Sequence, residues 1–252
     1  MSLRILSYNI ERGGVGREKA IASVIKSCEP DIVILEEASR PDIVQKLASA
    51  CGMKAWGAVQ GESLGFLSRV EIAEHAWHQI WLAKRQYLEL VLAGSNARIF
   101  GVHLAAVHSN LTERRRAYEL SSLLKSISRR QHGFHVVTGD FNTLAPGERL
   151  DVRRLPWRLR TVVYMTGRNI RWTTIQLMLD AGYADAYRIF HKDDGYTFPT
   201  WDPHVRLDYL FVPATSAPLV TGCKIVLNAP AVREASDHFP LLSEISEQAI
   251  TS

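Results

Sequence analysis

The chain has 252 residues, of which 46% are hydrophobic and 22% charged, which is ordinary for a soluble globular protein with a sizeable core. Its formal net charge of +4 permits an anionic partner but does not require one. The three cysteines are widely spaced, which argues against a disulfide framework or a zinc knuckle and favours a reducing compartment.

The first fifth of the chain predicts two strands and two helices. Leu3–Ile10 alternates enough for a strand, and its early start leaves no room for a signal peptide. Arg17–Cys28 has helical spacing. Asp31–Leu35 is a nearly continuous apolar strand, the pattern of a strand covered on both faces, and it runs directly into two glutamates. Pro41–Cys51 predicts a second helix, with proline in its first turn.

The rest of the chain contains more strands than helices, with glycine-containing turns between them. Pro146–Arg171 shows neither the alternation of a strand nor the spacing of a helix, and we expect it to be irregular and basic. We expect helices at Leu111–Ser128 and Thr173–Ala181, and strands at Lys54–Val59, Ser63–Arg69, Ile72–Leu82, Tyr87–Ala93, Ala97–Leu104, around His135–Thr138, and at Arg206–Val212, Leu219–Leu227 and Phe239–Ile245.

No linker, low-complexity stretch or short repeat divides these elements. We therefore expect one domain over residues 1–252, an α/β fold with two mixed sheets packed face to face and helices outside. No apolar run approaches the roughly 20 residues that span a bilayer. We expect a cytoplasmic monomer.

The stretch Val136–Thr143 predicts a buried strand that ends in a carboxylate and a carboxamide, Asp140 and Asn142. Residues two apart on an extended chain point the same way, so both can face one target. Gly139 would let the backbone pass close to a ligand. The alternative is an Asp/Asn turn after a strand.

Polar residues of three kinds recur at or near the ends of the apolar strands. A charge beside a core strand costs free energy unless it is paired or bound to a metal. Oxygen ligands without cysteine select Mg²⁺ or Mn²⁺ over structural zinc. The acids, amides and imidazoles in question are Asn9, Glu37, His103, Asp140, Asn142, Asp208, Asp237 and His238.

Seven stretches, in this order along the chain, resemble the endonuclease/exonuclease/phosphatase superfamily of DNase I-like enzymes. They are Ser7–Ile10, Pro30–Glu37, Gly65–Arg69, Val102–Leu104, Gly139–Asn142, Arg206–Tyr209 and Ser236–Leu241. The resemblance covers essentially the whole chain. It implies a four-layer α/β sandwich and a phosphoesterase that depends on Mg²⁺, with Mn²⁺ as a possible substitute.

The resemblance also implies a metal site. Glu37 is similar to the main metal ligand of the family, helped by Asn9, with Asp237 as a further metal or water ligand. Glu11 stands where some members carry an auxiliary aspartate. Many members have glutamine at the position of Glu36, which we expect to add negative charge near the metal but not to replace Glu37, because neighbours on a strand face opposite ways.

The catalytic residues that the resemblance implies are Asp140, Asn142, Asp208, His238 and His103. Asp140 would orient or deprotonate the attacking water, and Asn142 would hold the phosphate. His238 would contact the scissile phosphate, with Asp208 as its partner, and a carboxylate beside His238 would raise its pKa. His103 is similar to a second histidine near the leaving group. Whether Asp140 or His238 removes the proton stays open.

The segment Pro146–Arg171 contains seven arginines against two acidic residues, with aromatic residues between them. Basic side chains with aromatics suit a nucleic-acid groove, and we expect Arg153, Arg154, Trp157 and Arg158 to bind substrate. The expected partner is therefore a phosphate ester, nucleic acid first. A phospholipid diesterase, an inositol or other phosphomonoesterase, a solvated arginine-rich helix and a non-catalytic anion-binding module are the alternatives.

Overall fold

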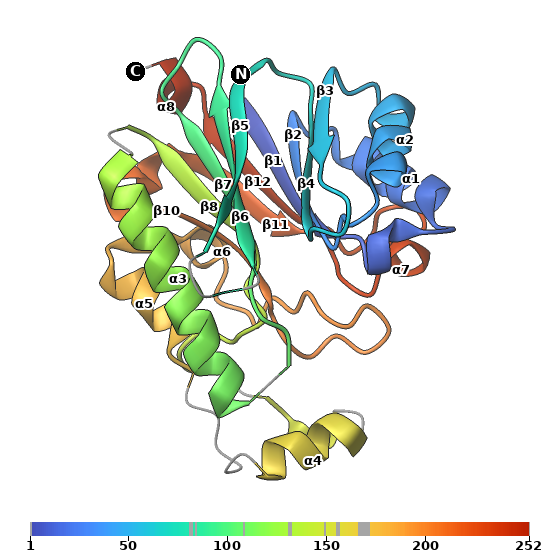
Figure 1. The fold of residues 1–252 in the computed structure, drawn as a ribbon, viewed down its shortest axis with the longest axis vertical. Coiled ribbons are helices and arrows are strands. Elements are labelled where there is room, and N and C mark those ends of the chain that lie inside the picture. Colours follow the sequence, from blue (N-terminus) through green and yellow to red (C-terminus); the bar gives the residue numbers. More distant parts are fainter. Residues whose placement is uncertain are drawn as a thin grey trace.

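The computed structural model describes residues 2–80, 83, 85–107, 109–130, 133–148, 150–154, 157–165 and 172–251 (Figure 1). Within these residues two six-stranded mixed sheets pack face to face, as the sequence predicts. The first sheet has the order β11-β12-β1-β2-β4-β3, formed by β1 (Ser2–Asn9), β2 (Ile32–Glu36), β3 (Ala55–Ala58), β4 (Leu64–Ser68), β11 (Val220–Ile225) and β12 (Leu241–Ser246). The second has the order β5-β6-β7-β8-β10-β9, formed by β5 (Ile72–Gln79), β6 (Gln86–Leu92), β7 (Arg98–His103), β8 (His135–Asp140), β9 (Tyr183–Asp185) and β10 (Asp208–Pro213).

All five residues of β2 are buried, which confirms the prediction of a strand covered on both faces. Alternate residues of this strand face opposite sides of the sheet. Ile34 packs between the two sheets in a cluster that includes Val136 of β8. Val33 and Leu35 pack on the outer side, against the helices of the first sheet.

Helices cover the outer faces of both sheets and complete the four layers (Figure 1). The apolar stripes of α1 (Glu18–Cys28) and α2 (Pro41–Cys51) pack on the first sheet. Those of α3 (Asn110–Arg130) and α5 (Thr174–Asp180) pack on the second. None of the helices in the described part of the chain combines the length and the apolar character that crossing a membrane requires.

Several short elements differ from the sequence prediction. The basic segment is not wholly irregular, because it contains a 3-10 turn at Val152–Arg154 and the helix α4 (Trp157–Met165). The strand expected to reach Leu82 ends at Gln79, and Leu82 itself lies outside the described residues. The elements not predicted at all are β9, α6 (Ala186–Phe190), α7 (Val232–Ala235), α8 (Gln248–Thr251) and the 3-10 turns Arg12–Gly14 and Ala214–Leu219.

Gly139 allows β7 and β8 to come together just before Asp140. Its φ is +143°, a region that side chains rarely adopt, and a Cβ atom built on it would lie 1.9 Å from the carbonyl oxygen of Val102. The missing side chain at Gly139 therefore lets the adjacent strand approach.

We predict that Gly139→Ala lowers the free energy of unfolding by at least about 2 kcal/mol, because strain and a backbone clash add. Gly147→Ala is the matched control, since Gly147 has φ +88° with no atom near its missing Cβ, and it should lose only about 1 kcal/mol. Urea unfolding curves of the two variants measure the difference. Equal losses would show that the Val102 contact is unimportant.

Candidate active site

The register of the second sheet sets three polar side chains side by side. His103 ends β7, Asp140 ends β8, and Asp208 begins β10. His103 pairs with Asp140 in the parallel ladder, and Asp140 pairs with Asp208 in the antiparallel one. Residues opposite one another on neighbouring strands project from the same face. Asn9 Nδ2 donates to Asp140 Oδ2 at 3.1 Å, so this is the face toward the first sheet.

A hydrogen bond joins His238, just before β12, to Asp208. The distance from His238 Nδ1 to Asp208 Oδ2 is 2.9 Å, which confirms the predicted pair, and His238 Nε2 lies 3.9 Å from Asp140 Oδ2. Burial alone lowers the pKa of His238, but the carboxylates of Asp208 and Asp140 raise it to about 10. His238 is therefore an imidazolium at neutral pH, with Nε2–H left as a donor.

Asp140 and Asn142 form a compact turn at the exit of β8. The Asn142 backbone N–H donates to Asp140 Oδ1 at 2.8 Å, and Asn142 Nδ2 donates to the Leu104 carbonyl at 3.2 Å. Asn142 has φ +53°, which asparagine tolerates better than most residues. Burial raises the pKa of Asp140 to about 7, although the His238 imidazolium opposes the shift.

His103 has the opposite protonation preference to His238. Burial lowers its pKa well below the ordinary value, and the charges of Arg85 and His238 lower it further. Its Nδ1 shares a hydrogen bond with Ser63 Oγ, and its Nε2 lies 3.7 Å from Asp140 Oδ2. The site thus contains one charged and one neutral imidazole.

The three remaining acids of the predicted site are Glu11, Glu37 and Asp237, and the first two lie close enough to Asp237 for their charges to act on it. Burial raises the pKa of the Asp237 carboxyl, and the charges of Glu11 and Glu37 add to the effect. Arg17 Nη1 holds Glu11 Oε2 at 2.9 Å, and the Arg12 backbone N–H donates to Glu37 Oε2 at 2.6 Å. A carboxylate whose charge is disfavoured by neighbouring acids calls for a cation, and an all-oxygen set fits a hard divalent ion.

A second group, Asp140, Asp208 and His238, also has ligand atoms close enough to hold a metal, all within 4.8 Å. His238 argues against that use. Asp208 and Asp140 raise the pKa of His238 and so favour its protonated form, which has no lone pair for an ion. The acids around Glu37 therefore match a divalent cation better than this compact group does.

Glu36 has a place that the sequence analysis did not foresee. Its carboxyl is fully buried, and Oε1 accepts from Ser7 Oγ at 2.8 Å. Among the described residues neither Glu36 Oε2 nor Asp208 Oδ1 has a hydrogen-bond partner. Burial raises the pKa of Glu36 well above its ordinary value, and the charge of Asp208 adds to this. This direction favours the neutral acid at Glu36, whereas the sequence analysis expects a negative charge there.

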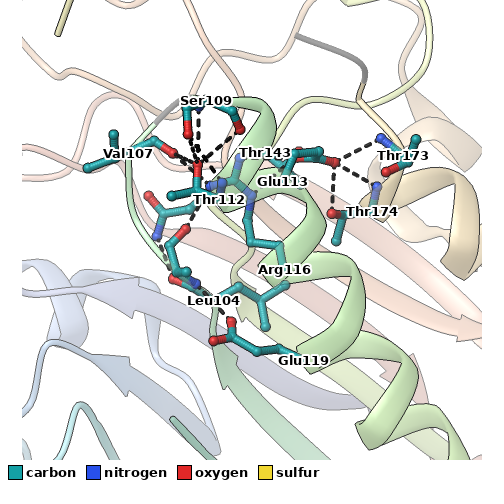
Figure 2. Close-up of polar contacts among 12 residues, drawn as sticks. Leu104, Val107, Ser109, Thr112, Glu113, Arg116, Glu119, Thr143, Thr173 and Thr174 are labelled. Atoms are coloured by element: carbon teal, nitrogen blue, oxygen red, sulfur yellow. Dashed lines mark hydrogen bonds and ion pairs between the residues drawn. The ribbon is translucent and has the colours of Figure 1, made fainter. Parts of the chain in front are cut away.

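Arg116 on α3 is fully buried and holds the loop that follows His103 (Figure 2). Its Nη1 donates to the carbonyls of Ala105 and Val107 at 2.7 and 2.9 Å. Its Nε and Nη2 donate to Glu113 Oε2 at 3.0 and 2.8 Å. In the run Arg114-Arg115-Arg116 the first two side chains are exposed, and Arg116 alone is buried.

Glu113 extends this network to the exit of β8 (Figure 2). Its Oε2 accepts from Thr143 Oγ1 at 2.8 Å, directly after Asn142. Its Oε1 accepts from Thr173 N and from Thr174 N and Oγ1, each at 2.8 Å. One buried ion pair therefore ties α3 and α5 to the loops that follow His103 and Asn142.

Of the predicted substrate-binding residues, Arg154 is linked to the site by the loop 197–205. The Phe198 ring centroid is 4.8 Å from that of His238, and Asp202 lies 3.5 Å from Arg154 Nη1. Arg153 is exposed and pairs with Asp151, and the Trp157 side chain is 69% exposed on α4. The side chain of Arg158, the fourth predicted residue, lies outside the described part.

The family profile of the Endonuclease/Exonuclease/phosphatase family matches residues 6–238. No curated protein sequence matches the chain.

Solved structures with the same fold include a 3′ phosphatase from Neisseria, NExo, bound to product DNA hairpin (TM-score 0.70, 18% identity, 97% of this chain and 99% of that one). An AP endonuclease from Archaeoglobus fulgidus has a TM-score of 0.73 at 15% identity, with 96% and 99% covered. D. rerio TDP2 complexed with single strand DNA product has a TM-score of 0.67 at 19% identity, with 96% and 98% covered. At these identities the likeness shows the fold.

Glu36 generates a prediction about stability and pH. A carboxyl whose pKa is raised by folding destabilises the fold as the pH rises from the ordinary glutamate value, about 4.3, toward the folded-state value. In that window wild-type stability should fall by up to about 1.4 kcal/mol per pH unit relative to Glu36→Gln, which cannot ionise.

Unfolding midpoints from pH 5 to 9, in the presence of a chelator, measure this difference. Glu71→Gln, a change at an exposed glutamate, is the control and should follow wild type. Parallel curves for Glu36→Gln and wild type would mean that Glu36 is not held neutral.

Proposed function

Because this chain belongs to the endonuclease/exonuclease/phosphatase family and is a hydrolase of phosphoric esters, we propose that its whole length forms one domain that cleaves phosphodiester bonds in nucleic acid. The observation that carries the proposal is the buried cluster of Asp140, Asp208 and His238, which combines a raised acid pKa with a fixed imidazolium. Perturbed groups of this kind are typical of catalytic sites.

In this proposal Glu37 is the main ligand of Mg²⁺ or Mn²⁺, with Asn9, Glu11 and Asp237 nearby. The mutual charge of these acids and the all-oxygen donor set support the assignment. The bound ion would neutralise phosphate oxygens and lower the pKa of water.

The remaining roles fall to the buried cluster and its neighbours. His238 Nε2–H donates to a non-bridging phosphate oxygen, and Asp208 keeps the ring charged and oriented. Asp140, with a pKa of about 7, accepts the proton of the attacking water. Asn142 uses its second amide hydrogen to hold the phosphate. His103 stays neutral beside the leaving oxygen.

Nucleic acid is the favoured substrate because Arg153, Arg154 and Trp157 are exposed, and Arg154 contacts Asp202 in the loop whose Phe198 ring packs on His238. The solved structures of NExo and TDP2 with DNA products agree with this choice. A lipid or inositol phosphoesterase would engage fewer phosphates, and a non-catalytic module would show no turnover with Mg²⁺. The proposal also includes a monomer in a reducing compartment, in keeping with three buried free cysteines.

We predict that Glu37→Gln lowers turnover of bis(p-nitrophenyl) phosphate by at least about 100-fold, because metal stabilisation of the transition state is worth several kcal/mol. Calorimetry should also show weaker Mn²⁺ binding. Glu71→Gln makes the same chemical change at an exposed position and should behave as wild type. Undiminished turnover of Glu37→Gln at saturating Mg²⁺ would refute the ligand assignment.

The nucleic-acid proposal predicts a steep dependence of affinity on salt. A log–log slope of about −0.7 to −0.9 is expected for each phosphate contacted, and replacing Arg153 and Arg154 by Ala should flatten it by about one contact or more. The measurement is KM on single-stranded and duplex DNA and RNA from low to physiological salt. The control is the double mutant Lys125→Ala with Arg129→Ala, which removes two exposed charges near the C-terminus of α3. An equal slope in both double mutants would contradict substrate binding at Arg153 and Arg154.

A further inference from the structure

A pocket of about 200 Å³ borders His103, and none of the proposed roles uses it. Its lining comes from the turn before β4, from β5 and β6, and from the end of β7. The residues are Gly61, Glu62, Ser63, Leu64, Trp77, Arg85, Gln86 and His103. It is smaller than the roughly 300–1,000 Å³ of pockets for drug-sized ligands, so it fits one small unit.

Arg85 supplies an unpaired cation in this pocket. Its side chain is half-buried, and among the described residues it makes no hydrogen bond or ion pair. Its charge is close enough to His103 to help lower the pKa of that imidazole. A partly desolvated guanidinium without an anion is unfavourable, and its planar fork suits a phosphate.

Two acceptors lie in the same pocket. Gln86 Oε1 is buried and accepts no hydrogen bond within the described residues. Glu62 lines the pocket without forming an ion pair with Arg85. The indole N–H of Trp77 is already bound to the Leu64 carbonyl at 2.9 Å, so Trp77 offers mainly its ring. One cation, two acceptors and an aromatic ring match a phosphate attached to a group with O–H or N–H donors.

The pocket adjoins the candidate active site, because Ser63 and His103 line it and His103 also approaches Asp140. Ser63 Oγ bonds His103 Nδ1 and accepts from the Glu37 backbone N–H at 3.3 Å. His103 thus borders the pocket, and its Nε2 lies 3.7 Å from Asp140 Oδ2. The ligand is therefore a part of the substrate that adjoins the scissile ester.

We propose that this pocket binds the nucleotide unit next to the scissile phosphodiester. Arg85 binds the phosphate of that unit, and Gln86 and Glu62 accept from its sugar hydroxyl or base N–H. The proposal rests on the proposed function and narrows it. The enzyme selects a diester that carries a second phosphate one unit away.

The test uses three dithymidine substrates with Mg²⁺: the unmodified diester, its 5′-phosphorylated form and its 3′-phosphorylated form. Wild type should prefer one phosphorylated form by at least about tenfold in kcat/KM, since hydrogen bonds between charged groups are the strong ones. Arg85→Gln should reduce that preference by at least about tenfold, and Arg85→Lys by less.

Arg69→Gln is the matched control. Arg69 is also half-buried, but it follows β4 at the opposite end, where its backbone N–H bonds the carbonyl of Asp31 ahead of β2. Arg69→Gln should keep the wild-type preference. This result would show that the effect of Arg85→Gln comes from a local contact and not from the loss of one positive charge. Melting temperatures identify variants that fail to fold. A wild type without preference, or a folded Arg85→Gln with the wild-type preference, would overturn the proposal.

Binding of thymidine 3′,5′-bisphosphate, measured by calorimetry with a chelator present, separates the pocket from the chemistry. Weaker binding by Arg85→Gln, at least about tenfold, supports the pocket even if no diester is cleaved, in which case the proposed function alone has failed. Equal binding by wild type and Arg85→Gln overturns the pocket even if diesters are cleaved.

Discussion

The hydrogen bond between His238 and Asp208 joins the two sheets at the edge where the polar residues meet. Asp208 opens β10 in the second sheet, and His238 lies just ahead of β12 in the first. A separation of 2.9 Å between their side chains requires the sheets to pack at a fixed depth and offset. The apolar cluster between the sheets provides this. The packing of the central core therefore sets the geometry of the site, and substitutions in that core should change the His238–Asp208 distance.

The two histidines show how one fold gives identical side chains different protonation states. Both rings are buried, which disfavours the charged form. His238 has a carboxylate at hydrogen-bond distance on Nδ1, whereas His103 has a serine there and the charge of Arg85 nearby. His238 therefore favours the charged form and His103 the neutral form, although both rings approach Asp140.

The sequence predicts the elements with a long apolar pattern and misses those without one. Apolar runs interrupted by single polar residues predict β2 and the polar ends of β7, β8 and β10. The Asp208–His238 pair was predicted from the family resemblance instead. Segments such as α7, of four residues, are too short to show a period. Helical spacing could have identified Arg116, because it shares a face with Glu113, Leu120 and Leu123. The Arg85 pocket has no sequence signal, since its lining is spread from Gly61 to His103.

The buried Glu113–Arg116 pair shows why a core position would keep charges. Apolar residues of similar size often stabilise a fold as well or better, while removing one partner of a buried pair is strongly destabilising. The use of this pair is therefore geometric. An apolar contact tolerates sliding, whereas the guanidinium donates to two carbonyls after His103, and the Glu113 carboxylate accepts from three groups at Thr173 and Thr174 and from Thr143 after Asn142. These bonds have one low-energy arrangement, and it holds the exits of β7 and β8 in the register that places His103 beside Asp140.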